Sequence, residues 1–265
     1  MNGLVLGTAD FIDKFQPVHA FHMKITNNEI RYIQGTSCQK VPCTLATLIF
    51  IDIFNPDLCD PVEWAKKTKA AGMKYAVITT KHHEGFNMFA SGYTDYNVMN
   101  TPYGKDIIKQ WVDAFRAEGL GVGFYYSLID WHHPEYTIDR VHPQSVSSQE
   151  EYDDLNKNRD MSIYREYLKN QVREILNNYG KIDILWLDYS FPGEFGKGRD
   201  DWGSVDLMKM VRELQPGIIV NDRADLKDYW GGWDFTTPEQ FKVHKWPEED
   251  GVRSPGETCQ TFSGS

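Results

Sequence analysis

An aspartate ends the most apolar stretch of this chain. Residues 182–188 read IDILWLD, and a run of Ile and Leu this dense predicts a strand buried on both faces of a parallel sheet. Asp188 then lies where the strand meets the next loop, which in an α/β barrel is the rim that carries catalytic groups. A rigid, partly desolvated carboxylate there is suited to attack or stabilise an electrophilic carbon. A helix N-cap is the alternative for a single aspartate in this position.

Three further polar clusters directly follow apolar segments: His82-His83, Tyr125-Tyr126-Ser127 and Asn221-Asp222-Arg223. Adjacent histidines on a strand point to opposite faces, so both line one pocket only if the strand ends or bulges there, which Gly85 permits. Imidazoles suit hydrogen bonding to substrate hydroxyls, and an arginine offers a fixed positive fork. Structural hydrogen bonds or a salt bridge would explain each cluster alone. Four strand ends on one rim nevertheless predict one site.

The elements that must position these residues alternate between strands and helices. Helices are predicted over residues 61–71, 106–118, 163–178 and 205–214, and strands over 75–80, 121–127, 182–188, 217–222 and, more weakly, 233–237. Residues 130–160 read as a long polar loop, and the first fifty residues fit no clear pattern. This alternation implies a parallel sheet, and we predict a single α/β domain over residues 1–265, a (β/α)₈ TIM-like barrel. The absence of G-x-G-x-x-G and P-loop motifs disfavours a nucleotide-binding sheet.

Composition narrows the class of partner. The formal net charge of −10 argues against a nucleic-acid partner, whose phosphates would be repelled. No apolar run approaches the roughly 20 residues that cross a bilayer, so no membrane partner is expected. No signal peptide is recognisable, which gives a cytoplasmic location as the default expectation. The four cysteines have neither C-x-x-C nor zinc-site spacing.

Several motifs, in order along the chain, resemble the family 29 glycoside hydrolases, which are α-L-fucosidases. They include Phe54-Asn55-Pro56, Lys81-His82-His83, residues 91–98 (SGYTDYNV), residues 123–127 (GFYYS), Trp186-Leu187-Asp188, Asn221-Asp222-Arg223, Thr237-Pro238-Glu239 and Glu257-Thr258-Cys259. The resemblance implies a barrel commonly followed by a β-sandwich, no metal and no organic cofactor. It also implies retaining hydrolysis of terminal α-L-fucosyl residues in fucosylated oligosaccharides or glycoconjugates.

The same resemblance implies a role for each matched residue. Asp188 would be the nucleophile and Glu257 the general acid/base, with Glu239 as the reserve acid/base. The residues that would bind the fucose ring are His82, His83, Tyr126, Trp186 and Arg223. A retaining mechanism needs the two carboxyl groups about 5–5.5 Å apart. Spacing along the chain does not decide between the two glutamates.

The chain also departs from the family pattern. It has no early His-Trp-Gly triplet, it carries Glu84 where Asp is usual, and it stops at Ser265, shortly after Glu257. We therefore expect an incomplete barrel without the β-sandwich. Its exposed strand edges would make it unstable unless a partner surface, such as that of a homo-oligomer, covered them. Two alternatives stay open: a catalytically silent fucose-binding remnant, and a metal-dependent barrel hydrolase using His82, His83, Asp188 and Asp222. Adjacent histidines share no face, which disfavours the metal site.

Overall fold

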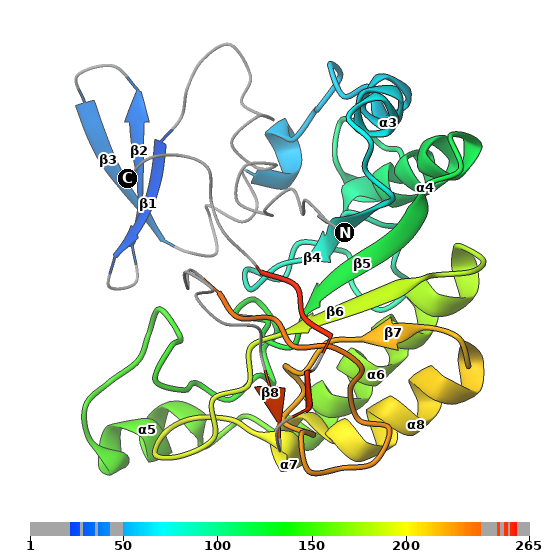
Figure 1. Ribbon diagram of the computed structural model, residues 1–265. Helices are drawn as coiled ribbons and strands as arrows, with labels where there is room; N and C mark the ends of the chain where they lie inside the picture. The colour runs from blue at the N-terminus through cyan, green and yellow to red at the C-terminus, as the bar shows by residue number, and fades with distance from the viewer. Residues whose placement is uncertain are drawn as a thin grey trace.

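A four-stranded parallel sheet forms the centre of the computed structural model (Figure 1). The strands are β4 (Tyr75–Lys81), β5 (Gly121–Ser127), β6 (Ile184–Asp188) and β7 (Ile219–Val220), hydrogen-bonded in that order. The structure describes residues 22–26, 29–34, 37–42, 50–239, 248–249, 252–253 and 255–258, with side chains for 50–239 and 255–258. Isolated parallel bridges continue the pairing beyond β7, from Asn221 to Phe235 and from Thr236 to Gly256.

The four predicted helices form, each within two residues of its predicted bounds. Asp60 caps α3 (Pro61–Ala70) by accepting from the Glu63 amide, and Gly72 follows the helix with φ +78°. Asp106 caps α4 (Ile107–Ala117) in the same way. The helices α6 (Met161–Asn178) and α8 (Ser204–Leu214) lie next to each other along the sheet (Figure 1). Each of these predicted helices is therefore confirmed.

The side chains of β5 and β6 divide between two faces of the sheet. Phe124, Leu185 and Leu187 pack with the helices in the main core. Tyr125, Ile184, Trp186 and Phe235 form a separate buried cluster, with Tyr75 and Val77 against it. Alternation along a strand produces this division, because neighbouring residues point to opposite faces. Side chains in phase with Tyr125 and Trp186 are therefore on the face away from the helices.

Other parts differ from the sequence prediction. Residues 130–160 are not all loop, because α5 (Gln149–Asn156) forms behind a capping box between Ser148 and Glu151. A short helix, α7 (Arg199–Trp202), precedes α8, and residues 233–237 make only isolated bridges. Residues 50–53 are helical, while residues 45–49 lie outside the described residues.

The N-terminal part contains an antiparallel sheet that the sequence did not reveal. Its strands are β1 (His22–Thr26), β2 (Glu29–Gln34) and β3 (Ser37–Pro42), in consecutive order. The two-residue strands β8 (Glu248–Glu249) and β9 (Val252–Arg253) pair with each other. In the described part of the chain the parallel sheet has four strands, so a closed eight-stranded barrel is not observed there.

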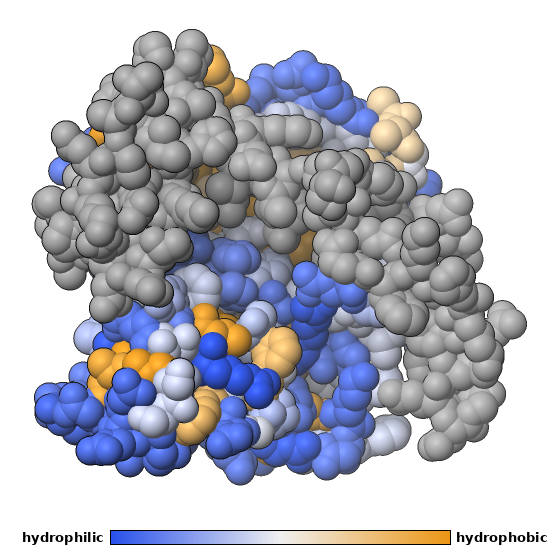
Figure 2. Space-filling view, turned by 90° about the vertical axis from the view of Figure 1, so that its left-hand side faces the viewer, coloured by the Kyte–Doolittle hydropathy of each residue, from blue (hydrophilic) through white to orange (hydrophobic). Residues whose placement is uncertain are grey.

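The described surface on the face in Figure 2 is mostly hydrophilic, with separate hydrophobic patches. Of the helices in the described residues, none has the length and apolar character that a membrane span needs.

Candidate active site

Asp188 is the last residue of β6 and is only 7% exposed. Both of its carboxylate oxygens accept hydrogen bonds. The Tyr125 hydroxyl donates to Oδ2 at 2.6 Å, and Nη1 of Arg223 donates to Oδ1 at 2.7 Å. Because Ser127 and Asp188 are paired between β5 and β6, the carboxylate is in phase with Tyr125 and Trp186. The side chain is thus fixed in orientation at the carboxyl edge of the sheet.

Arg223 is the central cation of the site and follows β7. Besides Asp188, its Nη1 donates to Oε2 of Glu239 at 2.8 Å, and its other nitrogens donate to Thr237. The guanidinium lies 4.4 Å from the centre of the Trp186 ring, which adds a cation–π contact. Burial alone would lower the pKa of Arg223, but the carboxylates of Asp188 and Glu239 raise it overall. The arginine therefore stays charged and holds the two acids together.

The two carboxyl groups on Arg223 are close to each other. Oδ1 of Asp188 lies 2.7 Å and Oε2 of Glu239 lies 2.8 Å from the same nitrogen, so the two oxygens are no more than about 5.5 Å apart. This limit is compatible with the separation of about 5–5.5 Å in glycosidases that work through a covalent intermediate. Inverting enzymes need a wider gap, which holds a water molecule.

The histidines lie side by side at the end of β4. Pairing between β4 and β5 shifts register between Thr79 and Lys81, so the strand is irregular just before them. The centres of the His82 and His83 rings are 4.1 Å apart, and the His82 ring stacks on Tyr125. The sequence prediction that an irregular strand end would bring both histidines to one place is therefore confirmed.

Gly85 makes this arrangement possible. It has φ +86°, and a Cβ atom there would lie 2.2 Å from Oδ1 of Asp130. His83 Nδ1 is hydrogen-bonded to the Ser127 hydroxyl at 2.7 Å. Burial, followed by the nearby His82 and Lys81, lowers the pKa of His83 to about 3. The imidazole is then neutral near pH 7 and offers one donor and one acceptor.

Tyr126, a predicted fucose contact, lies elsewhere. Its side chain is fully buried on the helix face of β5, where its hydroxyl donates to Gln171 of α6 at 2.8 Å. Strand alternation is the reason, since neighbours of Tyr125 point the other way. Tyr125, which belongs to the same predicted cluster but was not among the predicted fucose contacts, contacts Asp188 instead.

Glu257 is also placed differently from the prediction. Its side chain interacts with Tyr75, the first residue of β4, at the end of the sheet opposite to Asp188, while its amide donates to the Thr236 carbonyl at 2.9 Å. Burial raises the pKa of Glu257 to about 7, although a hydrogen bond with Tyr75 opposes that rise, and Oε1 is buried without a partner. This carboxyl has the pKa of a general acid, but no described contact links it to Asp188.

A buried ion pair that the sequence analysis did not single out lies behind the histidines. Nζ of Lys81 is 3.2 Å from Oδ2 of Asp130, with the two side chains 0% and 2% exposed. Asp130 Oδ1 accepts from the amides of His132 and His133. The Trp131 amide also donates to the His83 carbonyl. The ion pair and this hydrogen bond together connect the end of β4 with the loop after β5. A lysine directly before the two histidines was the available sequence signal.

Asp222 does not join the histidines as a metal ligand would. It accepts from the Thr237 amide at 3.1 Å and pairs with Lys227 at 2.9 Å. Among the described residues, no three His, Cys, Asp or Glu side chains are grouped closely enough to hold a metal ion.

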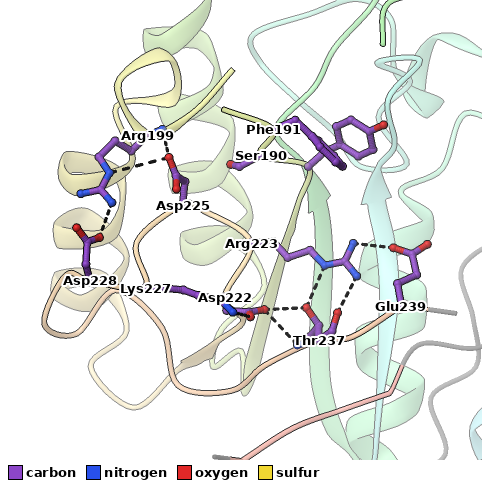
Figure 3. A pocket seen from close by; sticks show the side chains of 11 residues that line it. Ser190, Phe191, Arg199, Asp222, Arg223, Asp225, Lys227, Asp228, Thr237 and Glu239 are labelled. Carbon is purple, nitrogen blue, oxygen red and sulfur yellow. Dashed lines mark hydrogen bonds and ion pairs between the residues drawn. The ribbon is translucent and has the colours of Figure 1, made fainter. Parts of the chain in front are cut away.

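A cavity of about 520 Å³ opens beside Arg223 and Glu239 (Figure 3). That volume is in the range of small-molecule sites. Its wall contains Tyr189, Ser190, Phe191, Arg199, Asp222, Arg223, Asp225, Lys227, Asp228, Thr237 and Glu239.

Comparisons with known proteins agree on one family. The family model described as Alpha-L-fucosidase matches residues 10–265. An α-L-fucosidase of Dictyostelium discoideum is 28% identical over 208 residues, covering 74% of this chain and 41% of that protein. Tissue α-L-fucosidase of Bos taurus is 30% identical over 205 residues, covering 73% of this chain and 38% of that protein. The chain thus spans less than half the length of these curated relatives.

Solved structures give the same result. α-L-Fucosidase isoenzyme 1 from Paenibacillus thiaminolyticus is similar with a TM-score of 0.72 and 46% identity, covering 80% of this chain and 50% of that one. The α-L-fucosidase AlfC D200A in complex with Fucα(1,6)GlcNAc is similar with a TM-score of 0.63 and 28% identity, covering 81% of this chain and 63% of that one. A GH29 α-L-fucosidase from Bacteroides thetaiotaomicron is similar with a TM-score of 0.64 and 32% identity, covering 80% of this chain and 47% of that one.

Proposed function

The chain belongs to the α-L-fucosidase family, and from this membership we propose that it hydrolyses terminal α-L-fucosyl residues of fucosylated glycoconjugates with retention of configuration. The observation that carries the mechanistic part is the single Arg223 nitrogen that binds both Asp188 and Glu239. It limits the distance between one oxygen of each acid to about 5.5 Å, which is compatible with a double displacement.

In the first step Asp188 attacks the anomeric carbon. A bond forms between a carboxylate oxygen and that carbon, and the bond from the carbon to the leaving-group oxygen breaks. Glu239, whose side chain is 52% exposed, first takes up a proton from solvent and then gives it to that oxygen; in the second step it removes a proton from the water that releases fucose. We assign the acid/base role to Glu239 rather than to Glu257, because Glu239 shares Arg223 with the nucleophile.

Binding of fucose is assigned to the face that carries Asp188. His82 and His83 supply hydrogen-bonding nitrogens, while Tyr125 and Trp186 supply a stacked aromatic surface beside the carboxylate. Such a surface suits the apolar C–H groups and methyl group of a six-deoxy sugar.

The sheet topology supports a barrel as part of the same proposal. Parallel bridges after β7 extend the pairing in the direction that barrel closure requires. We propose that the described sheet is part of a (β/α)₈-like barrel and that residues 1–265 belong to one catalytic domain.

The test is hydrolysis of an aryl α-L-fucoside, followed through the released phenol. Asp188→Ala should abolish release and leave the far-ultraviolet circular dichroism spectrum unchanged. Incubation with a 2-deoxy-2-fluoro-fucosyl donor should add one fluorosugar to the peptide that contains Asp188. Label on any other residue, or undiminished release by Asp188→Ala, would show that the assignment is wrong. Fucose binding without turnover by the unaltered chain would remove the enzymatic proposal.

A further inference from the structure

The 520 Å³ cavity lies beside Glu239, the proposed general acid, and not at the histidines. Glu239 and Arg223 form part of its wall, whereas His82 and His83 do not. If Glu239 protonates the oxygen between fucose and the rest of the substrate, the space on its far side receives that remainder. This step rests on the proposed function. It gives the cavity a defined occupant, the leaving group.

A row of aromatic rings connects the histidines with this cavity. The His83 ring is 4.9 Å from the Tyr189 ring, edge to face, and the Tyr189 ring is 4.3 Å from that of Phe191. Phe191 is 42% exposed although it is a large apolar side chain. The guanidinium of Arg140 lies 5.5 Å from the centre of the Phe191 ring, so the row ends at the cavity wall in a partly exposed ring. The exposed part of that ring can stack against the C–H surface of a sugar.

The loop that carries these rings is held in place by its own contacts. Tyr189 has φ 84°, an uncommon conformation for a bulky residue, which a surrounding structure must enforce. Phe191 and Lys197 form an antiparallel bridge, and Lys197 makes a buried ion pair with Asp139 at 3.1 Å. The Trp202 indole donates to the Ser190 hydroxyl. A stacking surface fixed in advance loses less entropy on binding.

The polar side of the cavity consists of paired charges (Figure 3). Arg199 contacts Asp225 and Asp228, Lys227 contacts Asp222, and Arg223 contacts Glu239. Three cations and four carboxylates thus line the wall, each with a partner. Such pairs offer hydrogen-bond donors and acceptors to the hydroxyl groups of a ligand. Because carboxylates outnumber cations, binding of a negatively charged ligand is disfavoured.

We propose that this cavity is the leaving-group site and that it selects a neutral pyranose ring, stacked on Phe191, over an acidic one. The ring edge would meet the paired charges, and its glycosidic oxygen would face Glu239. Phe191 is then a specificity-determining residue that acts on the leaving group and not on fucose.

The experiment compares kcat/KM for two substrates. One is α-L-fucosyl fluoride, whose leaving group is too small to reach Phe191. The other is a disaccharide of α-L-fucose on a neutral N-acetylhexosamine. Phe191→Ala should lower kcat/KM for the disaccharide about tenfold and leave that for the fluoride unchanged. Phe191→Tyr, which keeps the ring, should restore the disaccharide rate. Trp230→Ala removes an aromatic side chain that is 98% exposed and outside the cavity wall, and serves as the matched control.

Three outcomes would overturn the proposal. Equal loss on both substrates in Phe191→Ala, not corrected by Phe191→Tyr, would make Phe191 a structural residue. No loss on the disaccharide would place the leaving group elsewhere. A third substrate carries α-L-fucose on a uronic acid. Faster cleavage of this acidic disaccharide than of the neutral one would contradict the charge argument. In each case the unaltered chain still cleaves fucosyl fluoride. Failure to cleave it would instead reject the proposed function and, with it, this site.

Discussion

Glu257→Gln should change how the stability of the protein depends on pH. Burial raises the pKa of the Glu257 carboxyl from an ordinary 4.5 to about 7. Glutamine keeps the size of the side chain and much of its hydrogen bonding but does not titrate. The substitution therefore separates the cost of a buried charge from the cost of a changed shape.

The sign follows from proton binding. Between pH 4.5 and about 7 the folded protein holds the Glu257 proton more tightly than the unfolded chain does. The free energy of unfolding then falls as the pH rises through this window and stays low above it. A shift of this size corresponds to about 3 kcal/mol at 1.36 kcal/mol per pH unit, which is an upper value because the carboxyl retains some contact with water. Relative to the unaltered chain, Glu257→Gln should gain about 2–3 kcal/mol of stability between pH 4.5 and pH 8.

Urea unfolding followed by circular dichroism at pH 4.5, 6 and 8 measures this change. Glu213→Gln, which removes an exposed carboxyl on α8, controls for the loss of one negative charge. The reasoning would be refuted if the stability difference between Glu257→Gln and the unaltered chain were the same at all three pH values. A difference that shrinks as the pH rises would have the wrong sign and would refute it equally.

Three further predictions concern the site and its support. Glu239→Gln should lower kcat/KM about 10²–10⁴-fold on fucosides with a poor leaving group but much less on fucosyl fluoride, which needs no protonation; equal losses in a steady-state assay would exclude a general acid. Tyr125→Phe removes the hydrogen bond to Asp188 and should lower kcat/KM about tenfold or more, whereas Tyr126→Phe should change kcat/KM less than about twofold. A larger loss of kcat/KM in Tyr126→Phe than in Tyr125→Phe would contradict the assigned strand faces. Lys81→Met leaves a buried carboxylate unpaired and should cost about 3–5 kcal/mol in urea unfolding, so a loss below about 1 kcal/mol would show that the pair is unimportant.

Local signals were sufficient for most elements around the site. Asp60 and Asp106 each cap a helix that the sequence predicts, although the prediction placed Asp106 inside the helix rather than before it. Strand β5 has the predicted bounds. The helix α5 was missed because only Tyr152 among its residues is buried, so it has no apolar stripe, although Ser148 and Glu151 do carry the capping-box pattern.

The site itself depends on relations that one sequence does not contain. Choosing between Tyr125 and Tyr126 requires the register of β5 against β6, which aligns Tyr125 with Trp186. Choosing between Glu239 and Glu257 requires the paths of two loops after β7. Arg223 brings Glu239 to Asp188 through contacts between segments far apart in the chain, and no local propensity encodes such contacts.

The side-by-side imidazoles owe their position to the main chain. One residue's slip in the ladder of β4, followed by a glycine turn at Gly85, places both residues, and each ring has its own hydrogen-bond partner, Glu84 for His82 and Ser127 for His83. Replacing His82 by asparagine should therefore leave His83 where it is. The scaffold would thus tolerate an exchange of functional groups at positions 82 and 83, which is a route by which preference for a different sugar could evolve without rebuilding the strand.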